Sequence, residues 1–239
     1  MSEPDDIQVE RQDDFDVYRP QNAIGPLPLV ILVHGPAPAG RRPRDSPFFG
    51  GYGRLLAGRG VAAVVVDVRY QGVDDWAPGT VWPPHADWTG TAIWLTAVVD
   101  RVRGVPGIDP DRVAIWAFSG GGMLTGSWLT ESPSWLRCLA LTYPVLADPF
   151  SGSTTPAACD MVRPGRPIVL TRVGRERPEF QATVDRLLAR AEEVGATIAV
   201  IDVPDGEHGF DAFVPELASC QPVLTAIATV AKHFNPEDL

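Results

Sequence analysis

Short, continuously apolar segments recur along this chain and are separated by polar or amphipathic stretches. A strand that is covered on both faces shows this pattern, because neither of its faces meets water. Such strands are typical of mostly parallel sheets with helices on both faces. The segments of this kind are residues 29–33, 61–66, 113–118, 136–142, 168–171 and 197–203.

Amphipathic segments lie between these strands. In residues 89–103 and 178–193 the apolar side chains recur at the spacing of one helical face. The alternation of strand and helix predicts an α/β fold built on a mostly parallel, twisted sheet. The predicted helices are residues 48–57, 89–103, 123–129, 178–193 and 215–234, the last of them broken or kinked near Pro222.

Residues 1–20 show a different pattern. Apolar positions alternate partially on either side of a polar turn at residues 11–14, which predicts an antiparallel pair of strands at a sheet edge. With 239 residues, of which 45% are hydrophobic, the chain can bury one sizeable core, so residues 1–239 are expected to form a single domain. Two long connections, residues 69–89 and 143–167, are expected to shape a pocket.

Charge and composition argue against several classes of partner. The formal net charge is −10 and the pI is near 4.8, whereas binding to nucleic acids or anionic membranes requires clustered cations. Residues 1–19 contain no apolar leader, and no apolar run has the length of a membrane span, so a cytoplasmic protein is expected. No cofactor and no metal are expected, because dinucleotide, Walker and zinc-protease motifs are missing from the sequence.

The apolar segment at residues 113–118 ends at Ser119, and three glycines and a helix-favouring segment follow. A turn from strand into helix at one residue brings the two backbones together, so the positions two before and two after the serine must be small. Ala117 and Gly121 meet this requirement. A serine hydroxyl is a weak nucleophile that needs a base to take its proton and donors to hold the oxyanion. Ser119 is therefore the candidate nucleophile.

The arrangement around Ser119 resembles the nucleophile elbow of the α/β-hydrolase superfamily, whose motif is G-x-S-x-G, with Ala117 in place of the first glycine. The resemblance covers residues 29–234 and is closest to small dienelactone-hydrolase-like proteins and carboxylesterases. Dienelactone hydrolases proper use cysteine where this chain has serine. The resemblance implies a single-domain α/β-hydrolase fold without a large cap, and a triad in the order serine, acid, histidine. The segments that carry it are residues 116–122, 173–178 and 207–210.

The resemblance places the base after the last strand, where His208 stands in a predicted turn at residues 204–210. Histidine suits this role because its ordinary pKa of about 6.5 lets it accept and return a proton near neutrality. The acid is expected after the preceding strand, where Glu176 stands at the position that the family usually fills with aspartate. The alternative carboxylates for this role are Asp148, Glu179 and Asp205.

The resemblance also implies two backbone N–H donors for an oxyanion. Gly120, directly after the nucleophile, would supply one. The second would come from Gly35 or from a residue at Ala37 or beyond, because Pro36 has no N–H group. The side chains expected to line the substrate pocket are His34, Trp82, His85 and Trp88.

Together these features predict a serine hydrolase that cleaves an ester, lactone or thioester of a small-molecule acyl substrate through an acyl-enzyme. Two other functions stay open. An acyltransferase or cyclase would use the same groups with an acceptor other than water, and a noncatalytic binding protein can share the fold. The sequence also leaves the oligomeric state open, a homodimer included.

Overall fold

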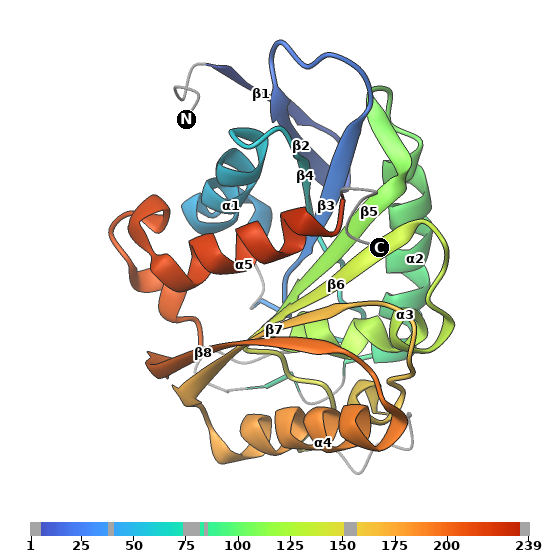
Figure 1. The fold of residues 1–239 in the computed structure, drawn as a ribbon, viewed down its shortest axis with the longest axis vertical. Coiled ribbons are helices and arrows are strands. Elements are labelled where there is room, and N and C mark those ends of the chain that lie inside the picture. The colour runs from blue at the N-terminus through green and yellow to red at the C-terminus, as the bar shows by residue number, and fades with distance from the viewer. Residues whose placement is uncertain (1–5, 38–40, 74–81, 84–85, 151–156, 235–239) are drawn as a thin grey trace.

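The computed structural model describes residues 6–37, 41–73, 82–83, 86–150 and 157–234 (Figure 1). Eight strands form one sheet in the order β1-β2-β4-β3-β5-β6-β7-β8. Every pair from β4 through β8 is parallel, whereas β1 pairs with β2, and β2 with β4, in antiparallel fashion. This confirms a mostly parallel sheet with an antiparallel pair at one edge. The strands are β1 (Ile7–Arg11), β2 (Phe15–Pro20), β3 (Leu27–Val33), β4 (Ala62–Val66), β5 (Ile108–Phe118), β6 (Leu136–Thr142), β7 (Ile168–Arg175) and β8 (Ile198–Glu207).

Helices cover both faces of this sheet (Figure 1). One face packs against α1 and α5, and the other packs against α2, α3 and α4. Of the part of the chain described between β6 and β7, only the short η4 is helical, which agrees with the absence of a large cap. The helices are α1 (Pro47–Ala57), α2 (Trp88–Arg103), α3 (Gly126–Glu131), α4 (Pro178–Val194) and α5 (Gln221–Lys232), and the 3-10 helices are η2 (Pro43–Asp45), η3 (Ser119–Thr125), η4 (Ala158–Asp160), η5 (Phe210–Phe213) and η6 (Leu217–Ser219).

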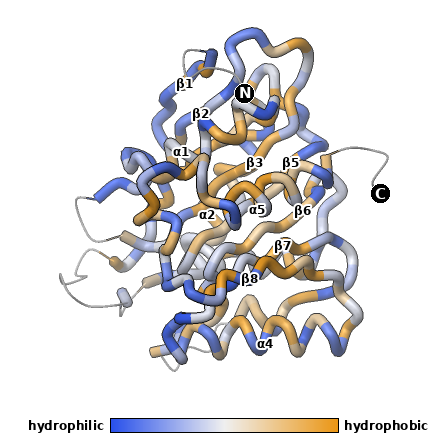
Figure 2. The backbone as a smooth tube through the Cα atoms, turned by 60° about the vertical axis from the view of Figure 1, so that its left-hand side comes forward, coloured by the Kyte–Doolittle hydropathy of each residue, from blue (hydrophilic) through white to orange (hydrophobic). Residues whose placement is uncertain are grey.

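The central strands are apolar throughout because both of their faces are buried. In β3, Leu29 and Ile31 point into the core under α2 to α4, whereas Val30 and Leu32 point into the core under α1 and α5. All four side chains are fully buried. Hydrophobic positions accordingly concentrate along the central strands, whereas α4 alternates between hydrophobic and hydrophilic positions (Figure 2). Each buried aliphatic side chain of this size contributes roughly 1.5–3 kcal/mol.

Two of the predicted helices are wrong in extent. The segment after Ser119 forms the 3-10 helix η3, and α3 begins only at Gly126. Glycine is a poor helix former, so the run of three glycines does not start a regular α-helix. Pro222 does not kink a long helix but stands in the first turn of α5, where its missing N–H costs no intrahelical bond.

The last two strands are longer than the apolar pattern predicts. β7 and β8 continue past their apolar stretches, and Arg175 still pairs with Glu207. Residues 204–207, predicted to begin a turn, are therefore part of β8. The extension is polar because β8 is the edge strand and its side chains meet water, so hydrophobicity does not mark where it ends.

No helix within the described residues is long and apolar enough to cross a membrane.

Candidate active site

Ser119 stands at the junction of β5 and η3 with a φ of 53°, a left-handed backbone conformation that is strained for a residue with a side chain. The turn is also tight. A Cβ on Gly121 would lie 2.7 Å from the carbonyl oxygen of Val33 at the end of β3. The N–H of Val145 donates to the carbonyl of Ser119 at 2.9 Å and fixes the turn from the other side. This is the geometry expected of a nucleophile elbow.

Three side chains from the carboxyl ends of three strands form one hydrogen-bonded chain. Ser119 Oγ lies 2.7 Å from Nε2 of His208, and Nδ1 of His208 lies 2.7 Å from Oε2 of Glu176. An ionised carboxylate only accepts, so Nδ1 donates to Glu176 and Nε2 is free to accept the proton of the hydroxyl. The Glu176 side chain is only 3% exposed, and that of His208 is 26% exposed.

A bulge at the end of β7 aims Glu176 at the histidine. The register with β8 shifts between Val173 and Arg175, and a Cβ on the intervening Gly174 would lie 2.1 Å from the carbonyl oxygen of Pro204. Only glycine permits so close an approach of two backbones, and a bulge redirects the side chains that follow it. Glu176 is further held because its Oε1 accepts from the N–H of Arg177 at 2.8 Å.

The three alternative carboxylates have other surroundings. Asp205 forms an ion pair with Arg175 and its side chain is 92% exposed. Asp148 accepts a hydrogen bond from the N–H of Phe150, and Glu179 is exposed in the first turn of α4. The structure therefore brings Glu176, and not these three, to the imidazole.

Aromatic rings surround the histidine. The rings of Tyr143 and Phe180 lie 4.9 and 5.3 Å from that of His208, centroid to centroid. Trp82, one of the residues predicted to line the pocket, packs 5.6 Å from Phe180, and a Cβ on Gly120 would lie 3.3 Å from its ring. Trp82 thus lies beside Gly120, the residue that follows Ser119.

The other predicted pocket residues are placed differently. The ring of Trp88 stacks on that of Trp82, with the ring centroids 5.3 Å apart. Trp88 also lines a cavity of about 240 Å³ between α2 and α3, together with Met123 and Met161. Neither Ser119 nor His208 lines this cavity. His85 lies outside the described residues.

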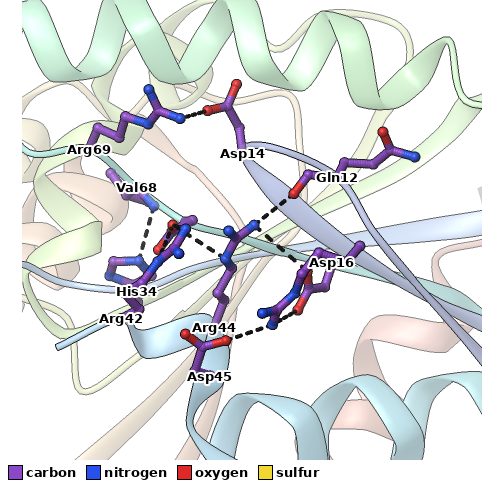
Figure 3. Close-up of polar contacts among 11 residues, drawn as sticks. Gln12, Asp14, Asp16, His34, Arg42, Arg44, Asp45, Val68 and Arg69 are labelled. Carbon is purple, nitrogen blue, oxygen red and sulfur yellow. Dashed lines mark hydrogen bonds and ion pairs between the residues drawn. The ribbon is translucent and has the colours of Figure 1, made fainter.

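His34 is buried, both of its ring nitrogens are bonded, and it does not line the cavity beside Trp88. Its Nδ1 donates to the carbonyl of Gly35 at 2.6 Å. Its Nε2 accepts from the N–H of Val68 at 3.0 Å, as Figure 3 shows. The two contacts fix the neutral tautomer. Burial lowers the pKa of His34 to about 4, against the opposing effects of the Gly35 carbonyl and Asp67. This histidine ties the turn after β3 to the segment after β4.

A cluster of ion pairs lies beside the hydrogen bond between Val68 and His34 (Figure 3). Arg44 is 5% exposed, donates to the carbonyl of Gln12 at 2.8 Å, and has its Nε 3.3 Å from a carboxylate oxygen of Asp67 without the alignment of a hydrogen bond. Its Nη1 lies 3.7 Å from Asp16, which is 2% exposed and also binds Arg11. Buried charges that are paired in this way stabilise the packing of β2 against the loops, whereas removal of one partner is costly.

The depressed pKa of His34 predicts that stability falls in mild acid. In the unfolded chain this histidine binds a proton below about pH 6.5, whereas in the native protein it remains neutral down to about pH 4. Stability therefore decreases as the pH falls, by about 2 kcal/mol between pH 7 and pH 5. Urea unfolding at the two pH values should show this loss in the wild type and not in His34→Gln. Asp211, whose pKa is raised, titrates in both proteins and cancels in the comparison. Equal pH dependence of the two proteins would contradict the prediction.

Three polar residues near the site escaped the sequence analysis. Tyr52 and Tyr143 are buried and both donate to the buried Asp211, and the Tyr143 ring contacts that of His208. The one signal in the sequence was the position of Asp211, three residues after the candidate base. Nothing in the sequence marked it as buried.

Comparisons with solved structures establish the fold. A protein described as a dienelactone hydrolase from Klebsiella pneumoniae subsp. pneumoniae superposes with a TM-score of 0.71 at 19% identity, over 95% of this chain and 98% of that one. Esterase B from Lactobacillus rhamnosis gives 0.73 at 18% identity, over 98% and 88%. Brefeldin A esterase, a bacterial homologue of human hormone-sensitive lipase, gives 0.69 at 17% identity, over 98% and 80%. The chain has the α/β-hydrolase fold, and its structural neighbours are dienelactone-hydrolase-like proteins and esterases.

Sequence comparison adds one relative. Dipeptidyl aminopeptidase BIII from Pseudoxanthomonas mexicana is 34% identical over 119 residues, a match that covers 48% of this chain and 16% of that protein. No family model matches the sequence.

Proposed function

We propose that the protein is a serine hydrolase that cleaves carboxylic esters through an acyl-enzyme. The observation that carries the proposal is the unbroken chain of hydrogen bonds from Ser119 Oγ through His208 to Glu176, with both distances at 2.7 Å. A nucleophile, a base and a group that orients the base are the parts that this chemistry needs. The esterases among the structural neighbours support the same reaction class.

The geometry supports a two-step reaction. Nε2 of His208 takes the hydroxyl proton as Ser119 Oγ attacks the carbonyl carbon of the ester. The tetrahedral intermediate collapses, the imidazolium gives that proton to the departing alkoxide, and an alcohol leaves. Water then attacks the acyl-serine, with His208 as base, and the acid is released as Oγ regains a proton. Glu176 stabilises the imidazolium in both steps and does not itself take the proton.

The oxyanion of each intermediate would be held between the turn after β3 and the start of η3. Gly120 is in the first turn of η3, where a backbone N–H has no intrahelical partner. Gly35 faces it across a short gap, since a Cβ on Gly35 would lie 2.9 Å from Gly120 N and 3.3 Å from Ser119 Cβ. We assign the two donors to Gly120 and to Gly35, with a residue at Ala37 or beyond as the alternative for the second.

Gly35→Ala tests this arrangement. The added methyl group would press on the N–H of Gly120, so the variant is expected to lose about 10²–10³-fold in kcat, the effect of losing one oxyanion donor. Steady-state hydrolysis of p-nitrophenyl butyrate measures the loss. Gly104→Ala is a control for an added methyl group, because the φ of Gly104 is −82° and the nearest atom to its Cβ position lies at 3.4 Å, an ordinary contact. Equal kcat values for Gly35→Ala and wild type would remove Gly35 from the site.

A fluorophosphonate probe and a series of p-nitrophenyl esters test the proposed function directly. The native protein should be labelled at Ser119 and should hydrolyse esters with small acyl groups. Peptide mapping of the labelled protein locates the adduct. A native protein that neither reacts with the probe nor hydrolyses any ester of the series would end the proposal.

Cleavage of a peptide bond is a second candidate, favoured by the similarity to a dipeptidyl aminopeptidase. The same three groups can attack an amide, with His208 protonating the leaving amine. Assays with dipeptide p-nitroanilides beside p-nitrophenyl esters distinguish the two reactions. A kcat/KM for the anilides above that for the esters would make the protein a peptidase.

A further inference from the structure

A carboxylate without a cationic partner is buried next to the candidate triad. Asp211 stands in η5, three residues after His208, and is 2% exposed. Its Oδ2 accepts from the hydroxyl of Tyr52 at 2.6 Å, and its Oδ1 accepts from the hydroxyl of Tyr143 at 2.8 Å. The contacts described for this carboxylate include no arginine, lysine or histidine.

Such an arrangement is costly for stability. Desolvation raises the pKa of Asp211, and the hydrogen bonds from the two phenols and from the backbone N–H groups of Asp211 and Ala212 only partly oppose it. Burial also raises the pKa values of Tyr52 and Tyr143 well above their ordinary range, so both remain neutral donors. An apolar group of similar volume at this position would avoid the cost of burying a charge. The carboxylate instead joins two phenols that belong to different parts of the fold, Tyr52 in α1 and Tyr143 after β6.

Tyr143 connects Asp211 to the segments that carry Ser119 and His208. It directly follows β6 with a φ of 35°, and its N–H donates to the carbonyl of Thr171 in β7 at 2.8 Å. Its ring lies 4.9 Å from the imidazole of His208, tilted by 56°. Two residues further along, Val145 binds the carbonyl of Ser119. Tyr143 thus contacts the histidine through its ring and is linked to the serine turn through the backbone at Val145.

Tyr52 connects the same carboxylate to the rigid core. It lies in α1, is 1% exposed, and packs edge-on against Trp116 and Phe118 of β5 at 5.3 and 5.0 Å. The segment that carries His208 leaves the edge strand β8 and turns at Gly209, whose φ of 76° is a conformation that glycine adopts without strain. Asp211, two residues further on, bonds this segment to Tyr52 in α1.

We propose that Tyr52, Asp211 and Tyr143 form a clamp that positions the imidazole of His208 against Ser119 Oγ. The inference rests on the proposed function, since it assigns Asp211 and Tyr143 as positioning residues for that reaction. Asp211 holds the segment that carries His208 to α1 through Tyr52, and the Tyr143 ring packs against the imidazole. Neither touches the reacting atoms.

Asp211→Asn tests the clamp while preserving its shape. A displacement of the imidazole by about 1 Å is expected to lower kcat about 10- to 100-fold, and KM should change less than about twofold because the substrate contacts are unaltered. The rate of fluorophosphonate labelling should fall in parallel with kcat. Tyr143→Phe should lower kcat in the same way, and the double variant should be little worse than either single one, because both changes break the same contact.

Asp16→Asn is the matched control. Asp16 is also a carboxylate that is 2% exposed, but it lies in β2 and is bound by Arg11 and Arg44. The substitution should lower the melting temperature and leave kcat per folded molecule unchanged. A merely structural role of Asp211 would give the same result for Asp211→Asn, a lowered melting temperature with normal kcat, and would overturn the clamp.

The two proposals fail in different ways. If the wild type neither hydrolyses esters nor reacts with the probe, the proposed function fails. If the wild type is active and a folded Asp211→Asn turns over at its kcat, the clamp alone fails. Should Asp211→Asn not fold, Tyr143→Phe decides the question, because it keeps the ring and removes one oxygen.

Discussion

Replacing Ser119 by alanine is expected to lower ester hydrolysis by about five to six orders of magnitude, the effect of removing the nucleophile from such a triad. The imidazole would retain its bond to Glu176, but no hydroxyl would remain for it to activate. Labelling by the fluorophosphonate should disappear as well. Turnover of p-nitrophenyl butyrate and gel-based detection of the probe measure the two effects.

Ser119→Gly is the control that separates chemistry from folding. The φ of 53° is strained for serine and for alanine but not for glycine. The glycine variant should therefore be as inactive as Ser119→Ala and more stable than it by about 1 kcal/mol. Labelling of Ser119→Ala at the wild-type level would show that another residue is the nucleophile.

Glu176→Gln is expected to lower kcat by about 10⁴-fold with little change in KM. The glutamine amide can donate to Nδ1, which favours the tautomer with the proton on Nε2, and that tautomer cannot accept from the serine hydroxyl. The carboxylate that stabilises the imidazolium is lost at the same time. Steady-state kinetics on a chromogenic ester measure both parameters.

Glu179→Gln is the matched control for this change. This control makes the same substitution at another glutamate, three residues away at an exposed position in α4. It should leave kcat unchanged. A Glu176→Gln variant with nearly normal kcat would transfer the orienting role to another carboxylate, and Asp148 and Asp205 would then be replaced in turn.

The sequence by itself determined the layered sheet and the order of the chemical groups. Strands such as β3 are apolar at every position because they are buried on both faces, and this pattern is visible without coordinates. The run of small residues around Ser119 likewise indicates a tight turn, since two backbones can approach only where side chains are small. Local composition is sufficient for such features.

Only the tertiary structure decided how distant segments meet. The polar end of β8 and the bulge at Gly174, which together bring Glu176 to His208, depend on pairing between strands and leave no apolar pattern. The burial of His34 and Asp211 depends equally on what packs over them, because the same residue types are more often exposed. Hydrophobic periodicity records which face of a segment is covered, whereas the partner of a polar side chain is set by contacts between residues far apart in the chain.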